Sequence, residues 1–140
     1  YLADCFVYDI ATKKITPVAK EKVRLAEFSP NSQKVAYVSN NNIFIFDLAS
    51  LQTKQITTDG EYNHIINGTT DWVDEEEFAI TKGFFWSNDS EKIAYYKFDE
   101  SKVKQFSMTM YGDLYPEEYV YKYPKAGEDN SVVEIFFFFL

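Results

Sequence analysis

Residues 28–38, FSPNSQKVAYV, decide the fold, because residues 86–96, WSNDSEKIAYY, repeat them without a gap. Each copy consists of an aromatic residue, a serine, a polar turn and an alternating apolar strand. Turn-forming residues between two apolar runs are typical of a hairpin. Each copy therefore predicts one strand that ends at the aromatic residue and a second that begins near Lys34 or Lys92.

A second repeated unit lies on either side of the first copy. Residues 6–16, FVYDIATKKIT, resemble FIFDLA at 44–49 followed by TKQIT at 53–57. In both, an apolar strand reaches an aspartate, turns through small polar residues and returns as a short strand. Joined in order, the units predict four strands from about Leu25 to Thr57, which is the size and content of one propeller blade.

The sequence therefore predicts an all-β protein, a partial β-propeller of about two to three four-stranded antiparallel blades. Residues 1–20 are expected to end one blade, 21–60 to form the next, 61–82 to connect, and 83–140 to form a further blade that a long insertion from Asp99 to Asn130 interrupts. The repeat places Phe139 where Asp47 stands in the preceding blade. Two and a half blades cannot close a ring, so we expect the chain to be part of a longer protein.

Composition excludes several classes of function. The chain is 46% hydrophobic and 19% aromatic, which suits half-buried sheets, and its net charge of -8 disfavours nucleic acid and anionic membranes as partners. Cys5 is the only cysteine, so we expect a small buried apolar side chain and neither an internal disulfide nor a cysteine-rich zinc site. No run of about 20 apolar residues could span a bilayer, and Tyr1 does not begin a signal peptide.

We expect no catalytic residue in this chain. Its single histidine, His64, would have to serve any Ser-His-Asp arrangement, and no G-x-S-x-G nucleophile elbow is present. The sequence predicts an ordinary surface or hydrogen-bonded role for His64. No cofactor is predicted.

The densest group of charges is DWVDEEEF at residues 71–78, with five carboxylates within seven residues. Like charges this close destabilise a fold unless a cation neutralises them, although a solvated acidic loop is the simpler alternative. Calcium would prefer a glycine-assisted loop that this run lacks, so no metal site is predicted. A primary ammonium fits better, because it is cationic at neutral pH and can bond two carboxylates. Neighbouring acids converge on one point most easily in a helical turn, which we predict around Asp74 to Glu77.

Four segments of the sequence resemble one known family. NGTTDWVDEEEF at 67–78, FWS at 85–87, IAY at 93–95 and YPKAG at 123–127 are similar to the propeller of dipeptidyl peptidase IV and its bacterial relatives, the prolyl dipeptidyl peptidases. The resemblance implies an eight-bladed propeller that covers an α/β-hydrolase domain and admits peptides to a serine exopeptidase, which releases X-Pro or X-Ala dipeptides.

The same resemblance assigns roles to individual residues. In the family a pair of glutamates on a short helical segment binds the free amino terminus of the substrate, and these match Glu76 and Glu77. Asp74 stands where the family commonly has tyrosine. The family's substrate-binding arginine would precede Tyr1, and the catalytic serine, aspartate and histidine would follow Leu140, in a hydrolase domain absent from this chain.

The implied partners are a peptide with a free N-terminus, the protein's own C-terminal hydrolase domain and a second copy of the chain. The insertion after Asp99 resembles the arm that helps to form the family's homodimer, and an ordinary long loop is the alternative. The bacterial character of the resemblance implies a periplasmic or other extracytoplasmic location. Two other functions stay open: a non-catalytic propeller used as a protein- or peptide-binding module, and a sister activity such as tripeptide release or acylaminoacyl cleavage.

Overall fold

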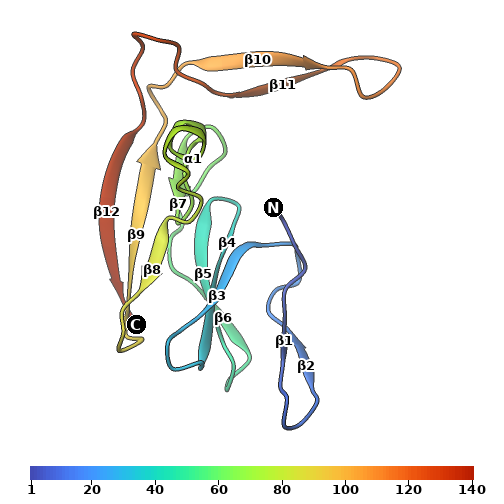
Figure 1. Ribbon diagram of the computed structural model, residues 1–140, viewed down its shortest axis with the longest axis vertical. Coiled ribbons are helices and arrows are strands. Elements are labelled where there is room, and N and C mark those ends of the chain that lie inside the picture. Colours follow the sequence, from blue (N-terminus) through green and yellow to red (C-terminus); the bar gives the residue numbers. More distant parts are fainter.

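The computed structural model describes all of residues 1–140 and contains strands and a single short helix, arranged as an open set of antiparallel sheets (Figure 1). The predicted all-β partial propeller is confirmed. One complete four-stranded sheet has the order β3 (Arg24–Phe28), β4 (Lys34–Ser39), β5 (Asn42–Asp47) and β6 (Gln52–Gln55). These are the four strands predicted between about Leu25 and Thr57.

The two repeated hairpin turns are built by the same hydrogen bonds. Ser29 accepts a bond at Oγ from the Lys34 amide at 3.0 Å, and Ser87 accepts the equivalent bond from the Lys92 amide at 2.9 Å. The two turns also touch, because the Asn31 amide donates to Oγ of Ser90 at 3.0 Å. The sequence repeat is therefore a repeat of backbone geometry, and it aligns neighbouring sheets turn to turn.

The second sheet contains β7 (Ile65–Asn67), β8 (Phe84–Trp86), β9 (Lys92–Asp99) and β12 (Val132–Phe139). Both β7 and β8 pair with the same edge of β9, one beyond the other. Between them, Tyr96 donates its amide proton to the Gly83 carbonyl at 2.8 Å and accepts from the Gly68 amide at 3.1 Å. Thus β7 and β8 are two halves of one inner strand, and residues between Gly68 and Gly83 leave the sheet as an excursion. Residues 61–82, predicted as a connection, supply half of that strand.

Two hairpins lie outside these sheets. β1 (Phe6–Tyr8) pairs with β2 (Ile15–Pro17) beside the first sheet, and β10 (Gln105–Met110) pairs with β11 (Glu117–Lys122) in an arm that projects from the body (Figure 1). The arm occupies the predicted insertion. Beyond it, β12 returns along β9 with Phe139 opposite Lys92, as Asp47 lies opposite Lys34. The position predicted for Phe139 by the repeat is confirmed.

Two buried clusters hold the sheets together. Strand β4 is buried on both faces, so its alternating side chains enter both clusters. Ala36 and Val38 pack with β5, Phe84 and Ile93, between the two four-stranded sheets. On the other face, Val35 and Tyr37 pack toward the β1–β2 hairpin, where Cys5 is half-buried. Stacking of sheets through both faces of a central strand is the packing expected of propeller blades. No helix here is long and apolar enough to cross a membrane.

Candidate functional site

The excursion between β7 and β8 carries α1 (Trp72–Phe78), which coincides with the helical turn predicted at the glutamate cluster. Asp71 caps its N-terminus, because Oδ1 accepts a hydrogen bond from the Asp74 amide at 2.9 Å. Ala79 ends the helix in the left-handed conformation, with φ 54°, and donates its amide proton to the Asp74 carbonyl. A helix this short is not stable by itself, so contacts outside it must fix its position.

The base of the excursion is closed by polar contacts. Thr70 donates from Oγ1 to the Ile80 carbonyl at 2.6 Å, and Thr69 donates in the same way to the Thr81 carbonyl at 3.4 Å. Both threonines are buried. These two bonds hold the segment that leaves the sheet against the segment that returns to it.

The end of the arm supplies the outer contacts of α1. The ring of Trp72 packs edge-on against Tyr123, with 4.6 Å between ring centroids. Ser131, at the start of the return to β12, donates a hydrogen bond from Oγ to Oδ2 of Asp71. Asp71 is 6% exposed, so its carboxylate joins the helix cap to the arm inside the protein.

Glu76 and Glu77, the two residues predicted to bind substrate, lie side by side in sequence on the exposed surface of α1. Neither forms an ion pair with a lysine or arginine of this chain, and neither side chain is hydrogen-bonded within it. Glu77 lines a hollow of about 290 Å³ together with Trp72 and Tyr123. Both acids are thus presented by a fixed helix and are free to meet an external cation.

Burial changes the titration of other carboxyls near α1. Burial, and then the neighbouring Asp71, raise the pKa of Asp74 to about 6. Burial and the charge of Asp71 raise the pKa of Glu100 to about 7, against the opposing effect of Lys122. Asp74 therefore adds a carboxyl that holds its proton more tightly than an exposed aspartate does.

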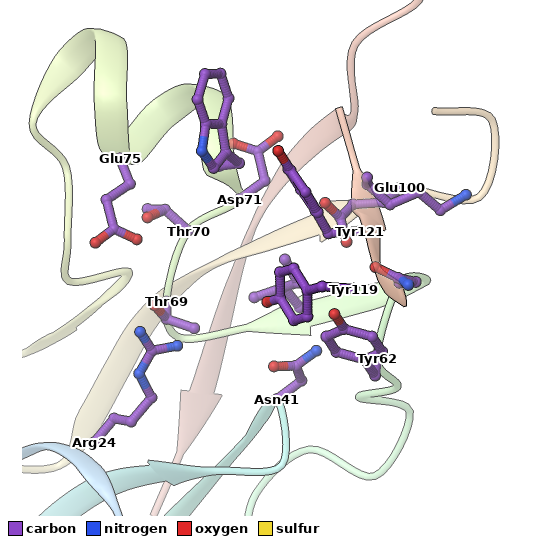
Figure 2. Close-up of a pocket in the computed structure, with 14 residues that line it drawn as sticks. Arg24, Asn41, Tyr62, Thr69, Thr70, Asp71, Glu75, Glu100, Tyr119 and Tyr121 are labelled. Carbon is purple, nitrogen blue, oxygen red and sulfur yellow. The ribbon is translucent and has the colours of Figure 1, made fainter. Parts of the chain in front are cut away.

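A second cavity, of about 200 Å³, opens between α1, the Asn41 turn and the base of the arm (Figure 2). Its walls include Arg24, in β3 of the first sheet, and Glu100, the residue directly after β9 of the second sheet. Glu75 faces this cavity, whereas Glu76 and Glu77 do not line it. Sequence patterns did not reveal it, because Arg24 and Glu100 are distant in the chain and neither belongs to a motif.

The remaining candidates have structural roles. His64 is exposed, and its Nδ1 lies 2.9 Å from Oε2 of Glu61, as the prediction of a surface histidine required. Nowhere in the chain do three histidine, cysteine, aspartate or glutamate side chains form a group that could hold a metal ion.

Comparison with known proteins gives a consistent result. A family model described as the dipeptidyl peptidase IV N-terminal region matches residues 1–140. The chain is 39% identical over 135 residues to dipeptidyl aminopeptidase B of Saccharomyces cerevisiae, a match that covers 93% of this chain and 16% of that protein. It is similar to the crystal structure of Porphyromonas gingivalis dipeptidyl peptidase 4, with a TM-score of 0.95 and 44% identity over 99% of this chain and 20% of that one. The chain thus spans a fifth or less of the length of these relatives.

Proposed function

This chain belongs to the dipeptidyl peptidase IV N-terminal region family, and we propose that in the complete protein it binds the free amino terminus of a peptide and admits that peptide to a serine peptidase domain. The observation that carries the proposal is the position of Glu76 and Glu77. Both are exposed on α1, and no lysine or arginine of the chain neutralises them.

The chemistry of a peptide amino terminus suits this pair. An α-amino group has a pKa of about 8, so it is largely cationic at neutral pH and has three protons to donate. Two adjacent carboxylates can share these protons in charge-assisted hydrogen bonds. With the amine held there, the second peptide bond would fall at the nucleophile, and X-Pro or X-Ala dipeptides would be released.

The rigidity of α1 supports a measuring role. Its N-terminus is bound through Asp71 to Ser131, and its first turn packs through Trp72 against Tyr123. A binding group that defines the cut two residues from the end of the substrate must be held to within a fraction of an ångström. A carboxylate pair on a mobile loop would not meet that requirement.

Glutamine substitutions in the complete protein test the proposal. Each of Glu76→Gln and Glu77→Gln should lower kcat/KM for an X-Pro chromogenic substrate by about 10- to 150-fold, because a hydrogen bond to a charged group contributes about 1.5–3 kcal/mol. Glu91→Gln, at an exposed turn far along the chain from α1, is the matched control and should leave turnover unchanged. Equal turnover by the parent and both α1 variants would refute the proposal.

A second part of the proposal is that the β10–β11 arm contacts a second copy of the protein. The arm pairs only with itself in the sheets, and its tip exposes Tyr111, Leu114 and Tyr115, which are 82%, 90% and 79% exposed. Exposed apolar side chains gathered at one point are typical of an association surface.

Sedimentation velocity of the complete protein should give a dimer for the parent and a monomer for Leu114→Asp. Ile10→Asp, at an aliphatic side chain in the β1–β2 turn that is 83% exposed, should remain dimeric. A monomeric parent would contradict the assignment.

We also propose a periplasmic location, which the bacterial character of the sequence resemblance supports. Dipeptidyl peptidase activity should be released from the source cells together with a periplasmic marker on osmotic shock. Activity that stays with a cytoplasmic marker would exclude this location.

A further inference from the structure

The cavity of about 200 Å³ beside α1 has a buried carboxylate next to an aromatic wall. The wall is formed by four side chains of the β7 approach, the helix and the arm, namely Tyr62, Trp72, Tyr119 and Tyr121. Glu100 lies on the side of Tyr119 and Tyr121, away from Arg24 (Figure 2). A carboxylate beside aromatic rings is a combination that suits an organic cation.

Glu100 is buried without a partner. It is 6% exposed, yet its carboxylate has no hydrogen bond or ion pair in the structure. Lys122 does not satisfy it, because Nζ of that lysine donates to the Val103 carbonyl at 2.6 Å. Burial and the charge of Asp71 raise the pKa of Glu100 to about 7. A buried carboxylate is unfavourable unless it is paired, so a cation that donates hydrogen bonds would stabilise the ionised side chain.

The aromatic wall is held in place by the arm and carries no protein cation. Tyr62 and Asn63 both donate side-chain hydrogen bonds to the Val120 carbonyl, at 3.0 and 3.1 Å. The ring centroids of Tyr119 and Tyr121 are 5.4 Å apart. Elsewhere in the chain lysines lie over phenylalanine rings, but no lysine or arginine lies over a ring of this wall. The faces of these rings are therefore free to attract a cation from outside the chain.

The ionised side chains around the cavity have one negative charge in excess. Three are carboxylates and two are cations, namely Asp71, Glu75, Glu100, Arg24 and Lys122. Glu75 faces Arg24 (Figure 2), and the carboxylate of Asp71 already accepts hydrogen bonds from the α1 backbone and from Ser131. Glu100 is therefore the acid that a ligand would meet, and one monovalent cation would balance the charge of the lining.

We propose that this cavity binds a primary alkylammonium ion. The ammonium donates hydrogen bonds to Glu100, and the alkyl chain packs against Tyr119 and Tyr121. The cavity has the volume of about six or seven waters at about 30 Å³ each, so an ammonium with a chain of about four carbons fits. The inference does not rest on the amine-binding role of α1, because Glu76 and Glu77 do not line this cavity.

Titration of the complete protein, followed by the NMR signals of the probe, tests the inference with three matched probes. n-Butylammonium carries a positive charge, n-butanol none and n-butyrate a negative one, whereas their alkyl chains are alike. At pH 8 Glu100, with a pKa of about 7, is largely ionised, and an alkylammonium with a pKa of about 10 keeps its proton. n-Butylammonium should bind at least tenfold more tightly than either of the other probes. Because only the probe changes, this comparison does not depend on the folding of any variant.

Two variants then locate the parts of the site. Glu100→Gln should weaken n-butylammonium binding at least tenfold and leave n-butanol binding unchanged. Tyr119→Leu keeps an apolar side chain but removes a ring, so it should weaken n-butylammonium binding by about 2- to 30-fold. Glu91→Gln is the matched control and should bind n-butylammonium as the parent does. Circular dichroism of each variant should match the parent.

The same ammonium chemistry belongs to a free aliphatic amine and to the side chain of a lysine in a peptide. Nα-acetyl-L-lysine methylamide, which has no α-amino group, distinguishes these two sources. Tighter binding of this probe than of n-butylammonium would assign the site to a peptide lysine. Weaker binding would assign it to a free amine.

Three results would overturn the inference. These are the absence of n-butylammonium binding at millimolar concentration, binding of n-butanol or n-butyrate as tight as that of n-butylammonium, and undiminished binding by Glu100→Gln. The combined Glu76→Gln and Glu77→Gln protein should keep the site. Binding that is lost in that protein but kept in Glu100→Gln would belong to α1, so this inference would fail while the proposed function would stand.

Discussion

Glu100 makes the stability of the corner between α1 and β9 depend on pH, and Glu100→Gln should remove that dependence. Burial and Asp71 raise the pKa of this carboxyl from 4.5 to about 7, while Lys122 opposes them. A folded-state pKa above the unfolded one means that the fold holds the proton more tightly. The stabilisation that the protonated Glu100 side chain contributes is therefore complete below pH 4.5 and is lost as pH rises through 7.

The size of the effect follows from the same values. A rise from 4.5 to about 7, at about 1.4 kcal/mol for each pH unit, corresponds to at most about 3 kcal/mol. Glutamine cannot ionise and is nearly the same size. At pH 8 the variant should therefore resist local opening up to about a hundredfold better than the parent, and at pH 4.5 the two should be equal.

Amide hydrogen exchange in the complete protein measures this directly. The ratio of exchange rates between variant and parent, taken at one pH, cancels the intrinsic pH dependence of exchange. We would follow the Glu100 amide, which donates to the His64 carbonyl at 2.8 Å, and the Val103 amide, which donates to the Glu100 carbonyl at 3.0 Å. Glu91→Gln should give a ratio of one at every pH. A variant that is less protected than the parent at pH 8, or a ratio that does not change from pH 4.5 to 8, would refute the reasoning.

Three further substitutions test the packing that positions the site. Asp71→Ala should destabilise α1 by about 1 kcal/mol through loss of its N-cap, whereas Asp71→Ser should destabilise it less because serine can still cap the helix. Hydrogen exchange of the amides in the first turn of α1 should be faster in the alanine variant than in the serine variant. Gly68→Ala should cost about 1–3 kcal/mol, because φ is +77° and the added Cβ would lie 2.6 Å from a side-chain atom of β5; Gly112→Ala, with nothing within 4 Å, should leave the melting temperature unchanged. Phe84→Ala should cost about 3–5 kcal/mol, since the side chain is 0% exposed, and Phe85→Ala, at 45% exposure, should lower the melting temperature less.

Local patterns in the sequence predicted the blade and the helix. The prediction from the hairpin repeat was correct because the serine of each copy forms the same hydrogen bond to the backbone. Similar residues therefore specify similar backbone geometry. The helical turn was predicted from the run of acids at 74–77, and the cap that Asp71 gives it also closes within three residues of the chain. Interactions that close within a few residues leave a signature that a single sequence can show.

Longer-range features left weaker signatures. The split inner strand joins two three-residue strands, β7 and β8, which are too short to show a period of two. The clearest marker of this split strand is a pair of glycines, Gly68 and Gly83. A Cβ on Gly83 would lie 2.7 Å from the Thr69 carbonyl oxygen, so the two segments can approach this closely only where Gly83 has no side chain. No short stretch of sequence marks the cavity beside α1, because Arg24 and Glu100 line the same cavity only in the folded chain.

The position of α1 depends on the arm more than on its own sequence. Seven residues cannot hold a helix in place, and the contacts that do so, Trp72 with Tyr123 and Asp71 with Ser131, both reach the segment that returns from the arm to β12. Lys104 and Glu128, paired at 2.8 Å, tie the two ends of the arm to each other. A displacement of the arm would therefore move the platform that presents Glu76 and Glu77. We expect changes at the arm to alter kcat/KM through the placement of these acids, even though the arm contributes neither of them.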